Sequence, residues 1–96
     1  GSLADAMNKK LAAFDSTLDI RGMRVEEMTP ILSDYLDEAA LLSIRYVRIL
    51  HGKGNGILRQ VVRQQLARRS DVETFEDEIL EMGGSGITVV KMSEGR

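Results

Sequence analysis

One glycine-rich segment of the chain carries residues suited to binding a phosphate. It runs His51-Gly52-Lys53-Gly54-Asn55-Gly56 and directly precedes a predicted helix. Glycines let backbone N–H groups approach an anion, the helix N-terminus adds partial positive charge, and Lys53 adds a full charge. The spacing matches neither a P-loop nor a dinucleotide fingerprint, which argues against a nucleotide-dependent enzyme. A tight strand-to-helix turn would favour the same glycines, so the loop alone leaves both interpretations open.

Three ionisable residues lie where predicted strands end. Asp19 and Arg21 finish a strand predicted over 17–21, and His51 follows one predicted over 46–50. Ligands bind at the carboxyl ends of parallel strands, so adjacent strands would bring the three within reach of one another. His51 can serve as a general acid or base, Asp19 can orient it, take a proton or hold a metal, and Arg21 can neutralise a phosphate. A structural histidine and a simple Asp19–Arg21 ion pair are the open alternatives.

The net charge of −2 hides an uneven distribution. No acidic residue occurs between Glu38 and Asp71, and the basic residues there are Arg45, Arg48, Lys53, Arg59, Arg63, Arg68 and Arg69. Arg59 and Arg63, one helical turn apart, share a face of the predicted helix. A solvated basic helix face would account for part of this pattern. Its position beside the glycine loop favours a polyanionic partner.

The composition excludes several kinds of site. The chain has no cysteine and one histidine, which excludes disulfides, thiolate chemistry, cysteine-ligated zinc and multi-histidine metal centres. Any metal would be a hard cation on carboxylates. No apolar run approaches the ~18 residues of a membrane span and no signal peptide opens the chain, so the expected location is the cytoplasm.

The hydrophobic patterns predict one α/β domain. The expected order is strand, helix, strand, helix, strand, strand, with strands at 17–21, 46–50, 72–76 and 87–92 and helices at 25–42 and 56–69. The first helix should tolerate Pro30 near its start. Right-handed crossovers would make the first three strands parallel neighbours, with the last one antiparallel. Two helices cover one face, so we expect a two-layer α/β sandwich with a four-stranded mixed sheet. A further helical segment at 3–14 has no assigned place in the core.

Three motifs together resemble the small MutS-related (Smr) domain. They are Leu18-Asp19-Ile20-Arg21-Gly22, then His51 to Gly56 with Leu58-Arg59, then Gly83-Gly84-Ser85-Gly86-Ile87-Thr88-Val89-Val90. Many stand-alone members have histidine where this chain has Arg21. Arginine there is similar to the version at the C-terminus of the bacterial MutS paralogue known as the second MutS family. The resemblance assigns 17–92 to the Smr domain, 1–16 to a linker or N-terminal helical extension, and 93–96 to a C-terminal tail.

The resemblance implies a fold similar to the C-terminal domain of translation initiation factor three. It also implies a nuclease that nicks DNA, including branched DNA, or cleaves RNA. In the parent protein, a MutS-like ATPase, it implies suppression of recombination or rescue of collided ribosomes. The family's acid maps to Asp19, its basic partner to Arg21, and its loop residues to His51, Gly52 and Gly54. Because Arg21 replaces histidine, a mechanism that needs two imidazoles does not fit this chain.

We therefore expect Asp19, Arg21 and His51 to be catalytic. The expected nucleic-acid-binding residues are Gly52, Lys53, Gly54, Asn55, Gly56, Arg59, Arg63, Gly84, Gly86 and Thr88. No resident metal site is predicted, although Mg²⁺ or Mn²⁺ would be expected if the substrate is DNA. The expected partners are DNA, RNA or the ribosome, with a monomeric isolated domain and a homodimeric parent. The alternative is a non-catalytic module that binds DNA or ribosomal RNA and positions the parent ATPase.

Overall fold

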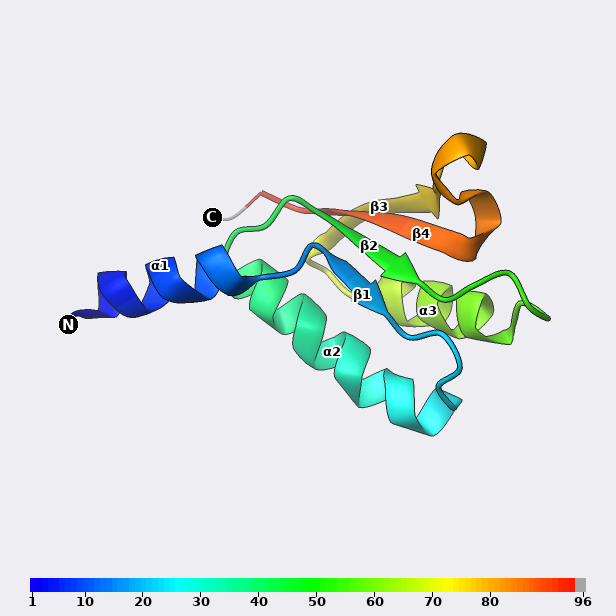
Figure 1. The fold of residues 1–96 in the computed structure, drawn as a ribbon, viewed down its shortest axis with the longest axis horizontal. Coiled ribbons are helices and arrows are strands. Elements are labelled where there is room, and N and C mark those ends of the chain that lie inside the picture. Colours follow the sequence, from blue (N-terminus) through cyan, green and yellow to red (C-terminus); the bar gives the residue numbers. More distant parts are fainter. Residues whose placement is uncertain (95–96) are drawn as a thin grey trace.

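Four strands form one mixed sheet in the computed structural model, which describes residues 1–94 (Figure 1). The strands are β1 (Thr17–Asp19), β2 (Tyr46–Leu50), β3 (Val72–Asp77) and β4 (Ile87–Met92). Their order across the sheet is β1-β2-β4-β3. β1 and β2 are parallel, and β4 is antiparallel to both of its neighbours. The predicted four-stranded mixed sheet is thus confirmed.

The predicted pairing of the first three strands as parallel neighbours is wrong for β3. β3 has the predicted direction, but β4 lies between it and β2. Burial explains this order. β4 is buried along most of its length, as suits the centre of a sheet. β3 exposes four of its six residues, including Glu73, Glu76 and Asp77, and charged residues of this kind protect a sheet edge from further pairing.

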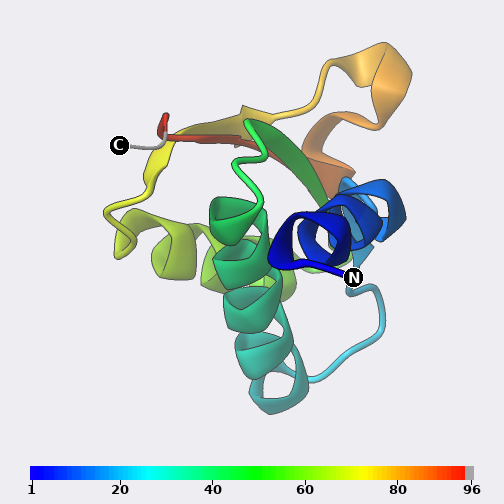
Figure 2. The same ribbon diagram turned by 90° about the vertical axis from the view of Figure 1, so that its left-hand side faces the viewer.

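Two helices cover one face of the sheet (Figures 1 and 2). They are α2 (Val25–Leu41) and α3 (Ile57–Ala67). Their buried residues recur every three or four positions and meet those of the sheet; the fully buried core includes Met28, Leu32, Leu36, Ala39, Val47, Ile49, Val62, Leu66, Val90 and Met92. Pro30 lies inside α2, which continues through it as predicted. The two-layer sandwich is confirmed.

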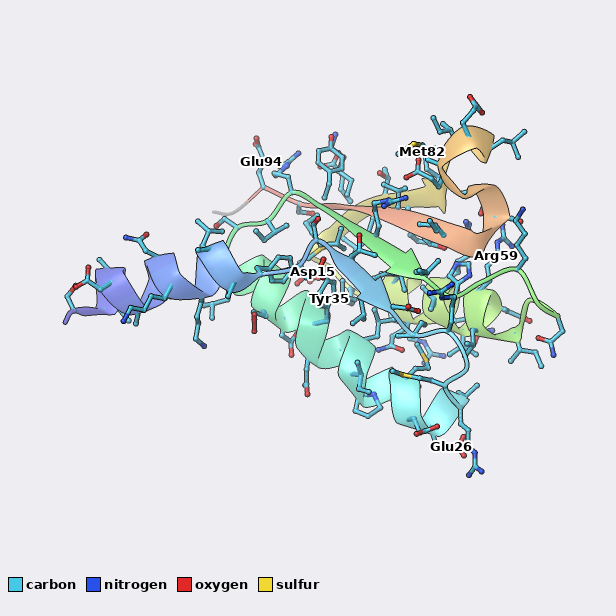
Figure 3. All side chains as sticks on the ribbon, viewed as in Figure 1. Asp15, Glu26, Tyr35, Arg59, Met82 and Glu94 are labelled. Carbon is cyan, nitrogen blue, oxygen red and sulfur yellow. The ribbon has the colours of Figure 1, made fainter. Side chains whose placement is uncertain are left out.

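The N-terminal segment forms a helix, α1 (Leu3–Ala13), that buries none of its residues and projects from the body (Figure 1). The Phe14 ring, just after it, stacks on the Tyr35 ring of α2 at 5.1 Å between centroids. The Tyr35 hydroxyl donates a 2.6 Å hydrogen bond to the Asp15 carbonyl (Figure 3). These contacts join the helical extension to α2, while α1 itself covers no face of the sheet.

Two short 3-10 helices, η1 (Leu80–Met82) and η2 (Gly84–Gly86), connect β3 to β4. Among residues 1–94, none of the helices has the length and apolar composition that a membrane-spanning helix needs. Of the predicted C-terminal tail, Gly95 and Arg96 lie outside the described residues.

Candidate functional site

The glycine-rich loop after β2 forms one wall of an open cleft of about 180 Å³. The cleft is lined by Gly22, His51, Gly52, Lys53, Gly54, Asn55, Gly56, Leu58 and Arg59. The three loop glycines all have positive φ angles, from 30° at Gly54 to 83° at Gly52, which residues with a side chain rarely adopt. The Asn55 side-chain oxygen accepts a 3.1 Å bond from the Ile57 N–H and so fixes the start of α3. The loop geometry that the sequence predicted is therefore present.

One carbonyl holds the base of this loop. The Gly86 oxygen accepts hydrogen bonds from the His51 N–H at 3.2 Å and the Gly52 N–H at 2.9 Å. Gly86 is buried, and a Cβ there would lie 3.3 Å from Cγ of Lys53. Further along, the N–H groups of residues 53–56 have no acceptor within residues 1–94. Residues 53–56 line the cleft, so their N–H groups are candidates to bind an anion there.

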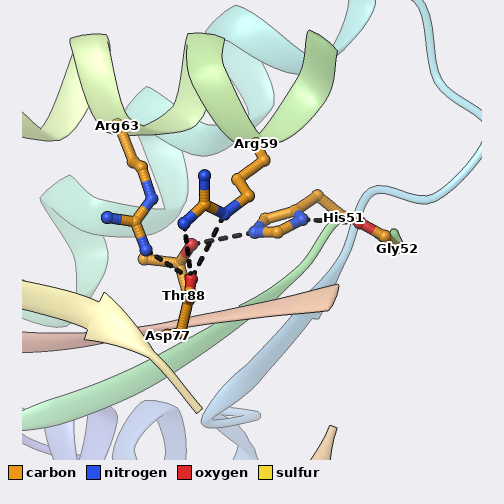
Figure 4. A network of polar contacts seen from close by, with 6 residues as sticks. All are labelled: His51, Gly52, Arg59, Arg63, Asp77 and Thr88. Atoms are coloured by element: carbon orange, nitrogen blue, oxygen red, sulfur yellow. Dashed lines mark hydrogen bonds and ion pairs between the residues drawn. The ribbon is translucent and has the colours of Figure 1, made fainter. Parts of the chain in front are cut away.

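His51 lies beneath the loop, with 5 % of its surface exposed, and its ring faces α3 (Figure 4). Its Nδ1 lies 2.9 Å from the Gly52 carbonyl, and its Nε2 lies 2.8 Å from the Thr88 hydroxyl. A carbonyl only accepts, so Nδ1 carries the hydrogen. Burial lowers the pKa of His51, and the positive charges of Arg59 and Arg63 lower it further. The ring is therefore neutral at pH 7, with Nε2 accepting from Thr88.

Arg59 and Arg63 share one carboxylate, that of Asp77 at the end of β3 (Figure 4). The Asp77 Oδ1 atom accepts from Arg59 Nη2 at 2.9 Å and from Arg63 Nη2 at 2.7 Å. The Arg59 hydrogen bond is the largest cause of the lowered pKa of Asp77. Asp77 thus offsets part of the positive charge that the sequence assigned to nucleic-acid binding. Asp77 was not among the site residues predicted from the sequence.

Asp19 and Arg21 form a tight pair beside the start of the glycine loop. The Asp19 Oδ1 atom accepts from Arg21 Nε at 3.0 Å, and Oδ2 accepts from Arg21 Nη2 at 2.8 Å. These bonds lower the pKa of Asp19 to about 2, so its carboxylate is ionised at neutral pH. Both side chains are about half exposed. The Arg21 side chain runs past Gly52, where an added Cβ would lie 3.5 Å from its Cγ.

The prediction that Asp19, Arg21 and His51 form one cluster is therefore wrong in part. Arg21 does lie against the loop, as expected. Asp19 pairs in register with Leu50, so these two side chains lie on the same face of the sheet. Side chains alternate between the two faces of a strand, so His51, which follows Leu50, turns to the opposite face, toward the helices. Both Asp19 oxygens bind Arg21, and both His51 nitrogens bind other groups. Asp19 does not orient His51.

The remaining predicted binding residues divide by exposure. Lys53, Gly54 and Asn55 are exposed, whereas Gly84, Gly86 and Thr88 are buried. A buried hydroxyl or backbone atom has no open path to a phosphate. Gly86 and Thr88 instead support the loop through hydrogen bonds to His51 and Gly52, and the Gly84 N–H bonds to the Ile79 carbonyl. Most of the basic stretch is also paired: Arg45 with Glu73, Arg48 with Glu78, and Arg69 with Asp37 and Asp71. Within residues 1–94, Lys53 and Arg68 form no ion pair, and Lys53 is the one at the cleft.

The side chains at the cleft do not fit a dedicated metal site. No group of three or more His, Asp or Glu side chains within the described part of the chain is arranged to hold a metal ion. No carboxylate of residues 1–94 lines the cleft, and both oxygens of the nearby Asp19 already accept from Arg21. Mg²⁺ sites usually combine one or two carboxylates with water and substrate phosphates.

Comparison with known proteins agrees with this fold. Residues 18–93 match the family model described as the Smr domain. The chain is 40 % identical over 81 residues to Endonuclease MutS2 of Staphylococcus carnosus and 41 % identical over 75 residues to that of Helicobacter pylori. These matches cover 84 % and 78 % of the chain. The chain spans about 10 % of the length of either relative.

Two solved structures share the architecture. The Smr domain of Thermus thermophilus MutS2 is 42 % identical, with a TM-score of 0.76 over 79 % of this chain and 95 % of that one. YdaL, a stand-alone small MutS-related protein from Escherichia coli, is 24 % identical, with a TM-score of 0.79 over 98 % of this chain and 79 % of that one. The second likeness concerns the fold alone. With the family match over residues 18–93, these findings show that the chain belongs to the Smr domain family.

Proposed function

We propose that this domain binds the phosphate backbone of a nucleic acid in the glycine cleft and cleaves it at the neighbouring Asp19–Arg21 pair. One observation carries the proposal: the cleft is lined by residues 53–56, whose backbone N–H groups have no acceptor and whose Lys53 has no ion pair within residues 1–94, and the ionised Asp19–Arg21 pair lies against the same loop at Gly52. The name endonuclease, borne by the relatives at about 40 % identity, supports the choice of cleavage over binding alone.

The binding step rests on charge and backbone geometry. Amides at residues 53–56, the N-terminus of α3 and the Lys53 ammonium all favour an anion at the same place. Contacts of this kind fix a phosphate without reading the base. The domain should therefore bind many sequences, with affinity that falls as salt rises.

The chemical step uses Asp19 and Arg21. A phosphate that accepts N–H groups from Arg21 takes them away from Asp19, because both oxygens of Asp19 use the same guanidinium. The freed carboxylate becomes a stronger base and accepts the proton of the attacking oxygen. That oxygen forms a new bond to phosphorus, the bond from phosphorus to the leaving oxygen breaks, and the leaving oxygen takes a proton from water. Arg21 and Lys53 stabilise the charge that develops on the phosphorus oxygens. His51, with both nitrogens engaged, positions the loop.

The attacking group depends on the substrate. In RNA the 2′-hydroxyl is an internal nucleophile, and in DNA a water must attack. The groups at Asp19 do not form a dedicated site for Mg²⁺ or Mn²⁺, so no step is assigned to a metal. In longer proteins that carry this domain, such cleavage would serve recombination suppression or rescue of collided ribosomes.

The test compares cutting with binding. The purified chain is incubated with branched DNA and with structured RNA, with and without EDTA, beside Asp19→Asn, Lys53→Gln and the control Arg68→Gln. We expect Asp19→Asn to bind at least as tightly as wild type, because Arg21 no longer pairs with a carboxylate, and to cut about 100-fold more slowly, the usual loss for a general base. Lys53→Gln should bind more weakly. Arg68→Gln, which alters an exposed residue at the end of α3, should change neither the binding affinity nor the cutting rate.

A binding module that does not cut is the second candidate. The observation that favours it is the burial of His51, since neither ring nitrogen is free to move a proton. If the domain binds without cutting, wild type binds nucleic acid, and neither wild type nor Asp19→Asn cuts above a mock preparation. That outcome would replace the nuclease proposal.

A further inference from the structure

The Asp77 carboxylate lies where two arginine side chains of α3 meet. Three donors converge on its Oδ1 atom: Arg59 Nε at 3.2 Å, Arg59 Nη2 at 2.9 Å and Arg63 Nη2 at 2.7 Å (Figure 4). The planar guanidinium group binds phosphates as well as carboxylates, because both present oxygens that accept its N–H groups. The position that the Asp77 carboxylate holds is therefore one that a backbone phosphate can take.

This position adjoins the glycine cleft, because Arg59 belongs to both. Arg59 lines the cleft together with Lys53 and the loop glycines, and its guanidinium group also binds Asp77. A nucleic-acid strand carries a negative charge at every nucleotide, so a strand with one phosphate at Lys53 has neighbouring phosphates that can reach Arg59. Asp77 thus holds a binding group that the cleft also offers to a ligand.

Arg63 has a second contact that positions it without Asp77. Its guanidinium carbon lies 5.6 Å from the centroid of the Phe75 ring, within the range of a cation–π interaction. The Arg63 side chain is 25 % exposed, against 37 % for Arg59 and 40 % for Asp77. The arginines therefore form a positioned pair of donors, and the carboxylate that binds them is the most exposed of the three groups.

The Asp77 carboxylate can leave the arginines by a movement of its side chain alone. Its backbone is fixed as the last residue of β3, opposite Thr88 of β4. Rotamer changes of exposed side chains take picoseconds to nanoseconds, so such a movement is fast. Once the carboxylate has left, the guanidinium groups of Arg59 and Arg63 repel each other at close range. Its departure is therefore favourable only when another anion takes its place.

We propose that Asp77 is an internal competitor of the nucleic acid: its carboxylate occupies a second phosphate site, formed by Arg59 and Arg63, and a backbone phosphate displaces it when a strand binds in the cleft. The inference rests on the proposed nucleic-acid binding and adds to it a second phosphate position and a limit on affinity. The displacement exchanges one anion for another at the same guanidinium groups, so it adds little net attraction. Asp77 thereby keeps the domain from binding every polyanion tightly.

The first experiment follows the displaced group in the wild-type chain. A single-stranded oligothymidylate is added to protein labelled with carbon-13 and nitrogen-15, and NMR records the Asp77 carboxyl carbon, the Arg59 Nε–H group and the backbone amides of residues 53–56. We expect all three sets of signals to shift and to reach their end points at the same DNA concentration. The carboxyl signal of Asp71 is the control, because its partner Arg69 lies beyond the other end of α3 and should keep it in place.

The second experiment separates displacement from a general effect of charge. The affinity for the same oligothymidylate is measured for wild type, Asp77→Asn, Arg63→Gln and the double variant, each first shown by circular dichroism to be folded. We expect Arg63→Gln to weaken binding by about twofold in wild type and by about fivefold in the Asp77→Asn background, because the phosphate then gains Arg63 without displacing a carboxylate. Asp71→Asn removes a carboxylate from an arginine pair away from the cleft and should change the affinity by less than about twofold.

The outcomes separate the two proposals. If neither the loop amides nor the Asp77 carboxyl signal shifts and no binding is measured, the proposed function fails and the inference fails with it. If the amides of residues 53–56 shift while the Asp77 signal stays in place, the cleft binds nucleic acid and the displacement proposal is wrong. If Arg63→Gln weakens binding equally in both backgrounds, Asp77 acts only through its charge, and the second phosphate site is overturned.

Discussion

The Thr88 hydroxyl donates a 2.8 Å hydrogen bond to Nε2 of His51, and this bond joins the central strand β4 to the loop that borders the cleft. Thr88 is fully buried and His51 nearly so. Removing the hydroxyl would leave a buried imidazole nitrogen without a donor. Such an unsatisfied group costs about 1–3 kcal/mol.

Thr88→Val is therefore expected to lower the free energy of unfolding by about 1–3 kcal/mol, because valine has a similar shape and no hydroxyl. Urea unfolding of the variant beside wild type measures the difference. Thr88→Ser keeps the hydroxyl and serves as the control. It should stay closer to wild type, and equal losses in both variants would mean that packing, not the hydrogen bond, determines the effect.

Stability should depend on pH through His51. Its pKa in the folded protein is lowered by burial and then by the charges of Arg59 and Arg63. Below its ordinary value of about 6.5 the unfolded chain binds the proton first, so the free energy of unfolding decreases as pH falls from about 7 toward 5, by at most about 1.4 kcal/mol per unit. Above pH 7 the effect is absent.

The measurement is urea unfolding at a series of pH values between about 5 and 8, where the carboxylates keep their charge. The lowered pKa values of Asp71 and Asp77 act at more acidic pH, since the stability they add is lost only as pH falls through their folded values. In His51→Gln the slope between pH 5 and 7 should be absent. A slope that persists in that variant would assign the pH dependence to other groups.

Lys53 is expected to contribute one phosphate contact. Lys53→Gln should weaken binding to every sequence and reduce the slope of log affinity against log salt by about 0.7–0.9, the value for one released counterion. Fluorescence anisotropy at several salt concentrations gives both numbers. Arg68→Gln removes the same charge away from the cleft and should leave the slope unchanged. Equal effects of both variants would indicate a diffuse electrostatic attraction.

Asp77→Asn separates binding from stability. The variant removes the carboxylate that Arg59 and Arg63 share, so both guanidinium groups become available to a phosphate. Affinity for nucleic acid should rise about three- to tenfold at low salt. The free energy of unfolding should fall, because two positive groups are left close together. Glu76→Gln, at the neighbouring exposed position of β3, is the control, and an affinity that does not rise would place the bound backbone away from Arg59 and Arg63.

The sequence predicted the order of the elements well because each leaves a local pattern. The α2 helix appeared from apolar residues every three or four positions, and β2 from the run 46–50. The order of strands in the sheet depends on contacts between distant segments, and the connection rules pointed to the wrong neighbour for β3. The relevant signal was present: 72–77 is rich in carboxylates, as an edge strand tends to be, while 87–92 is mostly apolar, as a central strand is.

The site was predicted in its backbone and less well in its side-chain pairing. The glycine loop follows from local spacing, and its geometry was found where expected. The Asp77 carboxylate lies 18 residues from Arg59 and 14 from Arg63, and no local pattern in a chain with 29 % charged residues identifies such pairs. The side toward which His51 turns depends on where β2 ends, a boundary that shifts by a residue or two in any sequence-based assignment.

The Gly86 carbonyl, which binds two successive N–H groups, has a consequence for motion. The amide hydrogens of His51 and Gly52 can exchange with solvent only when that one carbonyl moves away, so their exchange rates should change together. The neighbouring amides at 53–56 lack such a partner within residues 1–94 and should exchange quickly until an anion protects them. Hydrogen exchange would then show a boundary between Gly52 and Lys53. The amides of His51 and Gly52 are protected from exchange without a ligand, whereas those of residues 53–56 become protected only when an anion binds.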